Sequence, residues 1–192
     1  RIFYRVFEDT ENPYYETASS LLIQRSNVGK SPIEIACMLG RAEILKEIIK
    51  RGCSVNEANG AGYCPVHFAA AWGKLGCLEV LVESGASVDC RTNHGELAKD
   101  IAYRYDQNHC VYYLNWAAAK LDLLAFIAHV RELIADPEKL QGIKLTKDEK
   151  STILSSCTEK QEWVESTSDG KAEEFLEKKT ELEKQVDLVL NK

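Results

Sequence analysis

The stretch GYCPVHFAAAWGKLGCLEVLVESGASVD, residues 62–89, decides the fold because its pattern recurs along the chain. A shift of 33 residues superimposes its glycines, its proline and its small residues on two other segments. The matching positions are Gly29, Gly62 and Gly95; Pro32 and Pro65; Ala36, Ala69 and Ala102; and Gly40 and Gly73. Coincidence of this kind at one fixed period indicates a solenoid of stacked units.

The two better copies, 29–56 and 62–89, each predict a pair of helices. A proline opens the first helix of each pair, where its missing N–H costs nothing. A glycine then breaks the chain, and a second helix follows with its apolar residues on one face, as at Ile44, Leu45 and Ile48. Neither pair could bury its apolar face alone, so we expect neighbouring pairs to stack.

These residues resemble the ankyrin repeat. Cys64-Pro65-Val66-His67 stands where the family has Thr-Pro-Leu-His, and Ser31-Pro32-Ile33-Glu34 is a weaker copy. A third copy has Leu97-Ala98 for Thr-Pro and Asp106 for the middle glycine. The resemblance implies repeats at 27–59, 60–92 and 93–117, of which the last is degenerate, as a capping repeat should be. We interpret 1–26 as an N-terminal cap segment.

The second half predicts further helices. A connecting helix over 118–139 should end near Ala135, because Asp136-Pro137 pushes the preceding residue out of helical geometry. A bundle should fill 140–192, with a capping box at Thr146 and Glu149, and its two helices should pack on the long helix. The residues expected to face its core are Ile153, Leu154, Cys157, Gln161, Val164, Ala172, Phe175, Leu176, Leu182, Val186, Val189 and Leu190. The predicted fold is therefore all-α: a short ankyrin-repeat solenoid joined by a long helix to a small helical bundle.

Residues 140–192 are similar to the C-terminal helical lid of Hsp70 chaperones. The likeness is carried by Leu140-x-Gly142, Ile153-Leu154-x-x-Cys157, Trp163, Glu173-Glu174-Phe175 and Glu181-Leu182-Glu183. Nothing in the chain matches the nucleotide-binding domain or the β-sandwich of those chaperones. The resemblance therefore implies a helical bundle and not ATP-driven activity. Trp163 and Phe175 are expected in its core, and the acidic run 173–183 on a solvated face.

Composition narrows the classes of partner. The formal net charge is -6, and the chain has no arginine after Arg131, which argues against a nucleic-acid ligand. The longest stretch without a charged residue or a histidine, 110–119, is too short to span a bilayer, so no membrane partner is expected. Seven cysteines without a Cys-x-x-Cys pair favour reduced thiols and a cytoplasmic location. Because the chain starts at Arg1 and stops inside a helical pattern, we expect it to be part of a longer protein.

The cysteines and histidines of the repeats raise two further possibilities, a metal site and a catalytic site. Zinc needs four converging ligands, whereas Cys77 and Cys110 align with Ile44 at an apolar helix position and act as small hydrophobes. Cys64 precedes a helix, but Ser31 takes its place in the aligned copy, so the repeat requires a small hydrogen-bonding side chain there and not a thiol. The family resemblance makes His67 a residue that bridges the turn. We expect no metal, no cofactor, no small-molecule substrate and no enzymatic activity.

What remains is recognition of another protein. In ankyrin repeats the two residues before the middle glycine line a groove, and the turn tips project as fingers. By this resemblance the groove residues are Met38, Leu39, Trp72, Arg104 and Tyr105, and the finger residues are Asn59, Tyr63, Asn93 and His94. Exposed tryptophan and tyrosine are typical of interface hot spots. The alternative is that Trp72 packs on a neighbouring repeat or on the N-terminal segment.

The sequence therefore predicts a non-catalytic adaptor that binds one or more proteins through the groove and the fingers, with the helical tail as a second contact surface. Two alternatives stay open. The chain could be a fixed structural subunit of a large cytoskeletal or ciliary assembly, or an accessory of Hsp70 chaperones. Repeat folds do not identify their partners, because specificity depends on surface residues that the fold leaves variable.

Overall fold

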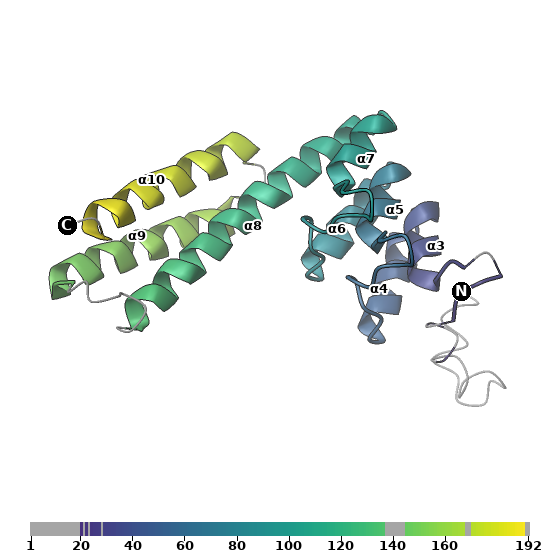
Figure 1. Cartoon of the computed structure of the whole chain (residues 1–192), viewed down its shortest axis with the longest axis horizontal. Coiled ribbons are helices and arrows are strands. Elements are labelled where there is room, and N and C mark those ends of the chain that lie inside the picture. Colours follow the sequence, from purple (N-terminus) through teal and green to yellow (C-terminus); the bar gives the residue numbers. More distant parts are fainter. Residues whose placement is uncertain are drawn as a thin grey trace. The chain divides into compact units, whose positions relative to one another are not determined.

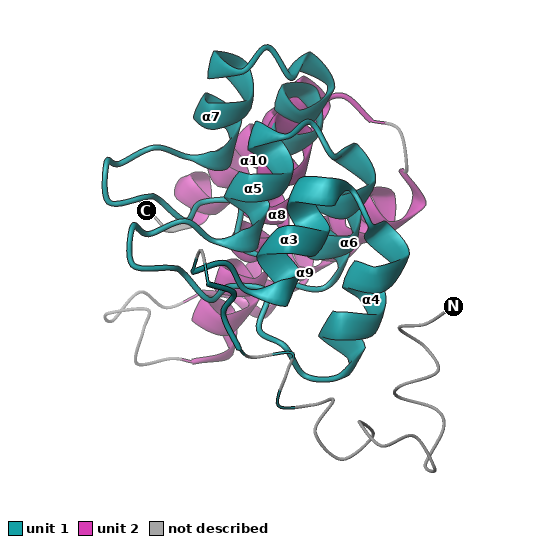
Figure 2. Ribbon diagram, turned by 90° about the vertical axis from the view of Figure 1, so that its right-hand side faces the viewer, with its two compact units in different colours: residues 1–114 teal, residues 115–192 magenta. Residues whose placement is uncertain are grey.

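The computed structural model describes residues 20, 22, 24–27, 29–136, 145–167 and 170–190. These residues form α-helices joined by turns, without a strand among them, so the predicted all-α class is confirmed (Figure 1). The predicted N-terminal cap, 1–26, lies outside the described residues except at 20, 22 and 24–26. The chain divides into two compact units, residues 1–114 and 115–192 (Figure 2).

Three pairs of helices follow one another in the first unit. The pairs are α3 (Pro32–Leu39) with α4 (Ala42–Lys50), α5 (Pro65–Ala71) with α6 (Leu75–Glu83), and α7 (Ala98–Arg104) with the start of α8 (Asn108–Ala135). Helix α5 packs against both α3 and α7, and α4 packs against α6, so the first helices form one row and the second helices another (Figure 1). Leu45, Leu78 and Leu114 are buried, and the repeats therefore share one core.

The turn inside each pair repeats its backbone conformation. Gly40 and Gly73 have φ values of 68° and 63°, the left-handed region that favours glycine. The third copy reaches the same conformation with Asp106, at φ 61°. The degenerate repeat thus keeps the turn although it lacks the glycine, and Asp106 carries the conformational cost that glycine avoids.

Helix α8 belongs to both units. It begins at Asn108, as the second helix of the third repeat, and ends at Ala135, where the Asp136-Pro137 step predicted the end. The sequence predicted a separate connector at 118–139; the division between units instead falls after Leu114, inside this helix. By length and composition alone α8 could cross a membrane, a test that the core helix of a soluble protein also passes.

The second unit has a single apolar core. Helices α9 (Lys147–Ser166) and α10 (Ala172–Leu190) pack against each other, and both contribute to a cluster with α8. The buried members are Ala119, Leu123, Ile127, Val130, Ile134, Ile153, Cys157, Val164, Phe175, Leu182 and Val186. The Phe175 ring lies 4.9 Å from the Trp163 ring and 6.2 Å from the Trp116 ring, measured between centroids. Trp163 and Phe175 are therefore core residues, as predicted.

Two expected core residues of this unit, Leu154 and Leu176, are exposed, and the side chain of Leu190 lies outside the described residues. Leu154 is 38% exposed and Leu176 is 49% exposed. Each directly follows a buried residue, Ile153 or Phe175, and lies about 100° further round its helix, outside the buried stripe. The stripe on α9 instead continues through Lys160, which is buried with its ammonium group 3.5 Å from the Glu181 carboxylate. A lysine stem can cover apolar surface in this way while its charge reaches the edge.

Candidate protein-binding surface

Three large apolar side chains lie at equivalent ends of successive first helices. Leu39 is the last residue of α3, and Trp72 and Tyr105 follow the last residues of α5 and α7. Their exposed fractions are 62%, 54% and 57%. Because the three positions are separated by one repeat each, we call Leu39, Trp72 and Tyr105 the apolar row. More than half of the Trp72 side chain is thus exposed to solvent. The groove hypothesis requires this exposure, and packing of Trp72 on a neighbouring repeat does not.

The other two predicted groove residues differ in character. Met38 is half-buried. Arg104 is exposed and its guanidinium lies 2.8 Å from the Glu96 carboxylate, a pairing that raises the pKa of Arg104 through the hydrogen bond to Glu96. The same guanidinium lies 5.6 Å from the Tyr105 ring centroid. Arg104 therefore orients the last member of the apolar row as well as offering a charge.

The third repeat exposes two further aromatic residues that the sequence reasoning did not single out. Tyr103 is 74% exposed and Tyr112 is 75% exposed. In the second repeat Ala70 and Glu79 stand at these positions, so the repeat pattern assigned no role to the two tyrosines. The signal was available in the alignment, because a tyrosine that replaces a small or charged residue of a repeat has no place in the shared core.

The finger turns are held by one hydrogen-bond pattern that recurs every 33 residues. Ser26, Asn59 and Thr92 each accept, through the side-chain oxygen, the backbone N–H four residues later, over 3.1, 3.0 and 3.3 Å. The backbone N–H of each donates in return to the carbonyl of that later residue. Arg25 and Arg91 add a bond to the carbonyls of Gly29 and Gly95. The fingers are therefore closed by local contacts, which short polar side chains favour.

Most of the predicted finger residues take part in this scaffold. Asn59 closes its own turn, and Asn93 reaches back to the preceding finger, where its side-chain amide donates to the Gly60 carbonyl over 3.1 Å. Tyr63 is half-buried, with its ring 5.7 Å from the rings of His67 and Phe68. His94 is exposed at its tip. Of the four, His94 is the residue whose side chain is best placed to touch a partner.

The start of each first helix is closed by a residue three positions after the cap. Glu34, His67 and Asp100, again one repeat apart, accept the backbone N–H of Ser31, Cys64 and Leu97 over 3.3, 3.0 and 3.0 Å. His67 and Glu34 are fully buried, and the Glu34 carboxylate is paired with Arg25 at 2.7 Å. His67 thus has the turn-bridging role that the family resemblance implied, and Glu34 performs it with a charge that needs a partner.

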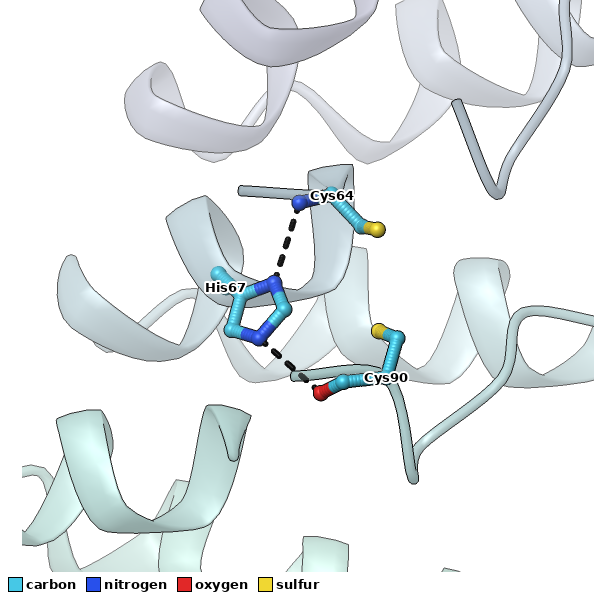
Figure 3. Close-up of side chains that lie close together, drawn as sticks. All are labelled: Cys64, His67 and Cys90. Carbon is cyan, nitrogen blue, oxygen red and sulfur yellow. Dashed lines mark hydrogen bonds between the residues drawn. The ribbon is translucent and has the colours of Figure 1, made fainter. Parts of the chain in front are cut away.

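His67 lies beside two thiols, and its hydrogen bonds decide what the group can do. The Cys64, His67 and Cys90 side chains place one potential ligand atom each within 4.8 Å of the others (Figure 3). Nδ1 of His67 accepts the Cys64 N–H, so the proton sits on Nε2, which donates to the Cys90 carbonyl over 3.2 Å. Burial lowers the pKa of His67 and keeps the ring neutral. With both ring nitrogens occupied, His67 is not available to a metal ion.

The thiols of this group are also held as donors. Cys64 Sγ–H donates to the Asn56 carbonyl over 3.6 Å, and Cys90 Sγ–H donates to the Ser87 carbonyl over 3.2 Å. Burial and the neighbouring Cys64 raise the pKa of Cys90 to about 12. A catalytic cysteine nucleophile needs a lowered pKa and a histidine able to take its proton, and this arrangement provides neither, so its thiols can react only slowly.

The fold and the turn geometry together define a short stack of helical repeats with exposed fingers. The family model for ankyrin repeats, in three copies, matches residues 9–92 and 33–125, and the chain belongs to the ankyrin-repeat family. It is similar to human ankyrin repeat domain-containing protein 45, with 46% identity over 179 residues, 93% of this chain and 67% of the relative. The mouse protein of the same name is 45% identical over 98% of this chain and 75% of its own length.

A zebrafish protein of that name is 46% identical over 89 residues, 46% of this chain and 39% of its own. These names describe repeats, and none of them names an enzyme. Ankyrin repeats are protein-interaction modules, so the coarse class predicted from the sequence is confirmed.

Proposed function

We propose that this chain is a non-catalytic adaptor of the cytoplasm that binds a partner protein through the apolar row. The observation that carries the proposal is the exposure of Leu39, Trp72 and Tyr105, each more than half open, at one-repeat intervals. Aromatic side chains of this kind supply large contact area at low entropic cost and dominate binding energies. Tyr103, in the same helix as Arg104, extends the apolar surface of the third repeat.

A photo-crosslinking amino acid at position 72 tests this proposal. We expect the substituted chain to capture partner peptides in cell extract when the label is at Trp72 or at Tyr105. The matched control carries the label at Lys46, which is exposed on α4. Equal capture from all three positions, or none from the first two, would show that the apolar row is not the interface.

Once a partner is captured, substitution measures how much each side chain contributes to the free energy of binding. Trp72→Ala should weaken binding by about 30-fold, which corresponds to the roughly 2 kcal/mol that defines a hot spot. Lys46→Ala should change affinity little, because Lys46 lies outside the apolar row and its exposed pair with Glu43 contributes little. Circular dichroism of both variants separates lost binding from lost fold.

The second unit supports a second contact surface. Leu176 and Leu188, on α10, are 49% and 73% exposed. Leu188→Ser should remove a partner bound by this unit while leaving crosslinks from position 72 unchanged; loss of both would place the two contacts in one interface. The likeness of 140–192 to the Hsp70 lid stays a prediction, which addition of the chain to an Hsp70 ATPase assay would test.

A further inference from the structure

The second repeat holds two cysteine thiols side by side. Cys64 is the residue before α5, and Cys90 lies in the loop between α6 and α7. Their sulfur atoms are no more than 4.8 Å apart, and both point into the space between the two residues (Figure 3). The aligned positions of the first repeat hold Ser31 and Glu57, so the thiol pair is particular to the second repeat.

We propose that Cys64 and Cys90 are an oxidative modification site, at which a peroxide converts the two thiols into a disulfide between the start and the end of the second repeat. The sulfur–sulfur bond length of a disulfide is about 2 Å, so formation requires the two sulfur atoms to approach each other by a further 2–3 Å at most. Cys90 lies in a loop and can make that adjustment. Formation would join the start of α5 to the loop that precedes α7.

The oxidation proceeds in two balanced steps. The Cys90 thiolate attacks one oxygen of hydrogen peroxide, the O–O bond breaks, and Cys90 becomes a sulfenic acid while hydroxide leaves and takes up a proton as water. Cys64 then attacks the Cys90 sulfur as its thiolate, the S–OH bond breaks, and a second water leaves. Two thiols lose two electrons and two protons, and one peroxide is reduced to two waters.

Access decides which cysteine reacts first. Cys90 is half-buried, whereas Cys64 is only 5% exposed, so peroxide reaches Cys90 and Cys64 resolves the intermediate. Cys37 and Cys77 are closed to solvent, at 0% and 1%. Burial also raises the pKa of Cys90, which makes the first step slow at neutral pH and confines it to sustained oxidation.

Proteolysis can place each cysteine of this region in a separate peptide for mass spectrometry. Cleavage after lysine, arginine and glutamate leaves Cys53 in 52–57, Cys64 in 58–74, Cys77 in 75–79 and Cys90 in 84–91. The folded chain is treated with hydrogen peroxide, its remaining thiols are alkylated, and the digest is analysed by mass spectrometry without reduction. We expect peptide 58–74 joined to peptide 84–91, and we expect dithiothreitol to separate them.

Two controls make the outcome decisive. Oxidation in urea should pair the cysteines without preference, since the selectivity comes from the fold, and Cys53→Ser should leave the joined peptides unchanged. The proposal is wrong if the folded chain yields Cys90 sulfinic acid or a Cys90 pairing with another cysteine in place of the joined peptides. It is also wrong if Cys90 stays a thiol while Cys53 is oxidised. These results do not depend on partner binding.

Discussion

The two hydrogen bonds of His67 lead to the sharpest prediction about stability. His67→Ala removes the acceptor of the buried Cys64 N–H and the donor to the Cys90 carbonyl. Each buried group left without its partner costs about 1–3 kcal/mol, and the space of the lost ring adds to this, so we expect a loss of about 3–5 kcal/mol. Asp100→Ala, at the equivalent exposed position, loses one cap bond and should cost about 0.5–2 kcal/mol.

The same residue makes stability depend on pH. Burial lowers the pKa of His67 in the folded chain, so between that pKa and the ordinary value of about 6.5 the unfolded chain binds the extra proton. The stabilising contribution is therefore complete above about pH 6.5 and is lost as the pH falls toward the folded pKa. One proton limits the slope to about 1.4 kcal/mol per pH unit.

His67→Gln is the matched variant for this effect. Glutamine at the third helical position can still accept the N–H of the cap residue, but it does not titrate. Urea unfolding followed by circular dichroism at pH 7.5 and at pH 5.5 should show a smaller pH effect in this variant than in the parent chain. If the two chains lose the same stability on acidification, or if His67→Ala costs no more than Asp100→Ala, the assigned role of His67 is wrong.

Three further substitutions test the repeat geometry by urea unfolding. Gly62→Ala should cost about 1–3 kcal/mol more stability than Gly95→Ala. Both glycines have positive φ, but a Cβ at Gly62 would lie 2.6 Å from the Asn93 backbone nitrogen, whereas a Cβ at Gly95 would have no atom within 4 Å. Equal losses in the two variants would refute this. Asp106→Gly should stabilise the chain by about 0.5–1 kcal/mol by removing left-handed strain, and a loss of stability would show that the aspartate side chain matters more. Arg25→Ala should cost about 1–3 kcal/mol of stability by leaving the buried Glu34 carboxylate without its ion pair. The double variant Arg25→Ala with Glu34→Gln should recover most of that stability. Failure to recover it would show that the ion pair is unimportant.

The repeat part of the fold could be predicted from the sequence because its signals are local. Pro32 and Pro65 open helices, Gly40 and Gly73 take left-handed turns, and a period of 33 residues fixes which of these positions correspond. The end of α8 at Ala135 was also predictable, since proline restricts the residue before it.

Other features depend on contacts between residues far apart in the sequence. Periodicity placed Leu154, and not Lys160, on the core face, whereas the structure exposes the leucine and buries the lysine with the Glu181 carboxylate close to its charge. Cys64 and Cys90 are 26 positions apart and come together only when the second repeat folds. For the candidate surface, the alignment supplied the apolar row by resemblance, and it also carried a signal for Tyr103 and Tyr112, whose exposure the structure shows.

The bonds that close the finger turns, at Ser26, Asn59 and Thr92, each span four residues. Contacts over so short a stretch form quickly and lose little chain entropy, so these turns can be present before the repeats meet and can guide the order of folding. These bonds do not use the side chains of Ala61 and His94. Substitutions at Ala61 or His94 can accumulate between species without harm to the scaffold, which leaves the tips free to evolve toward different partners.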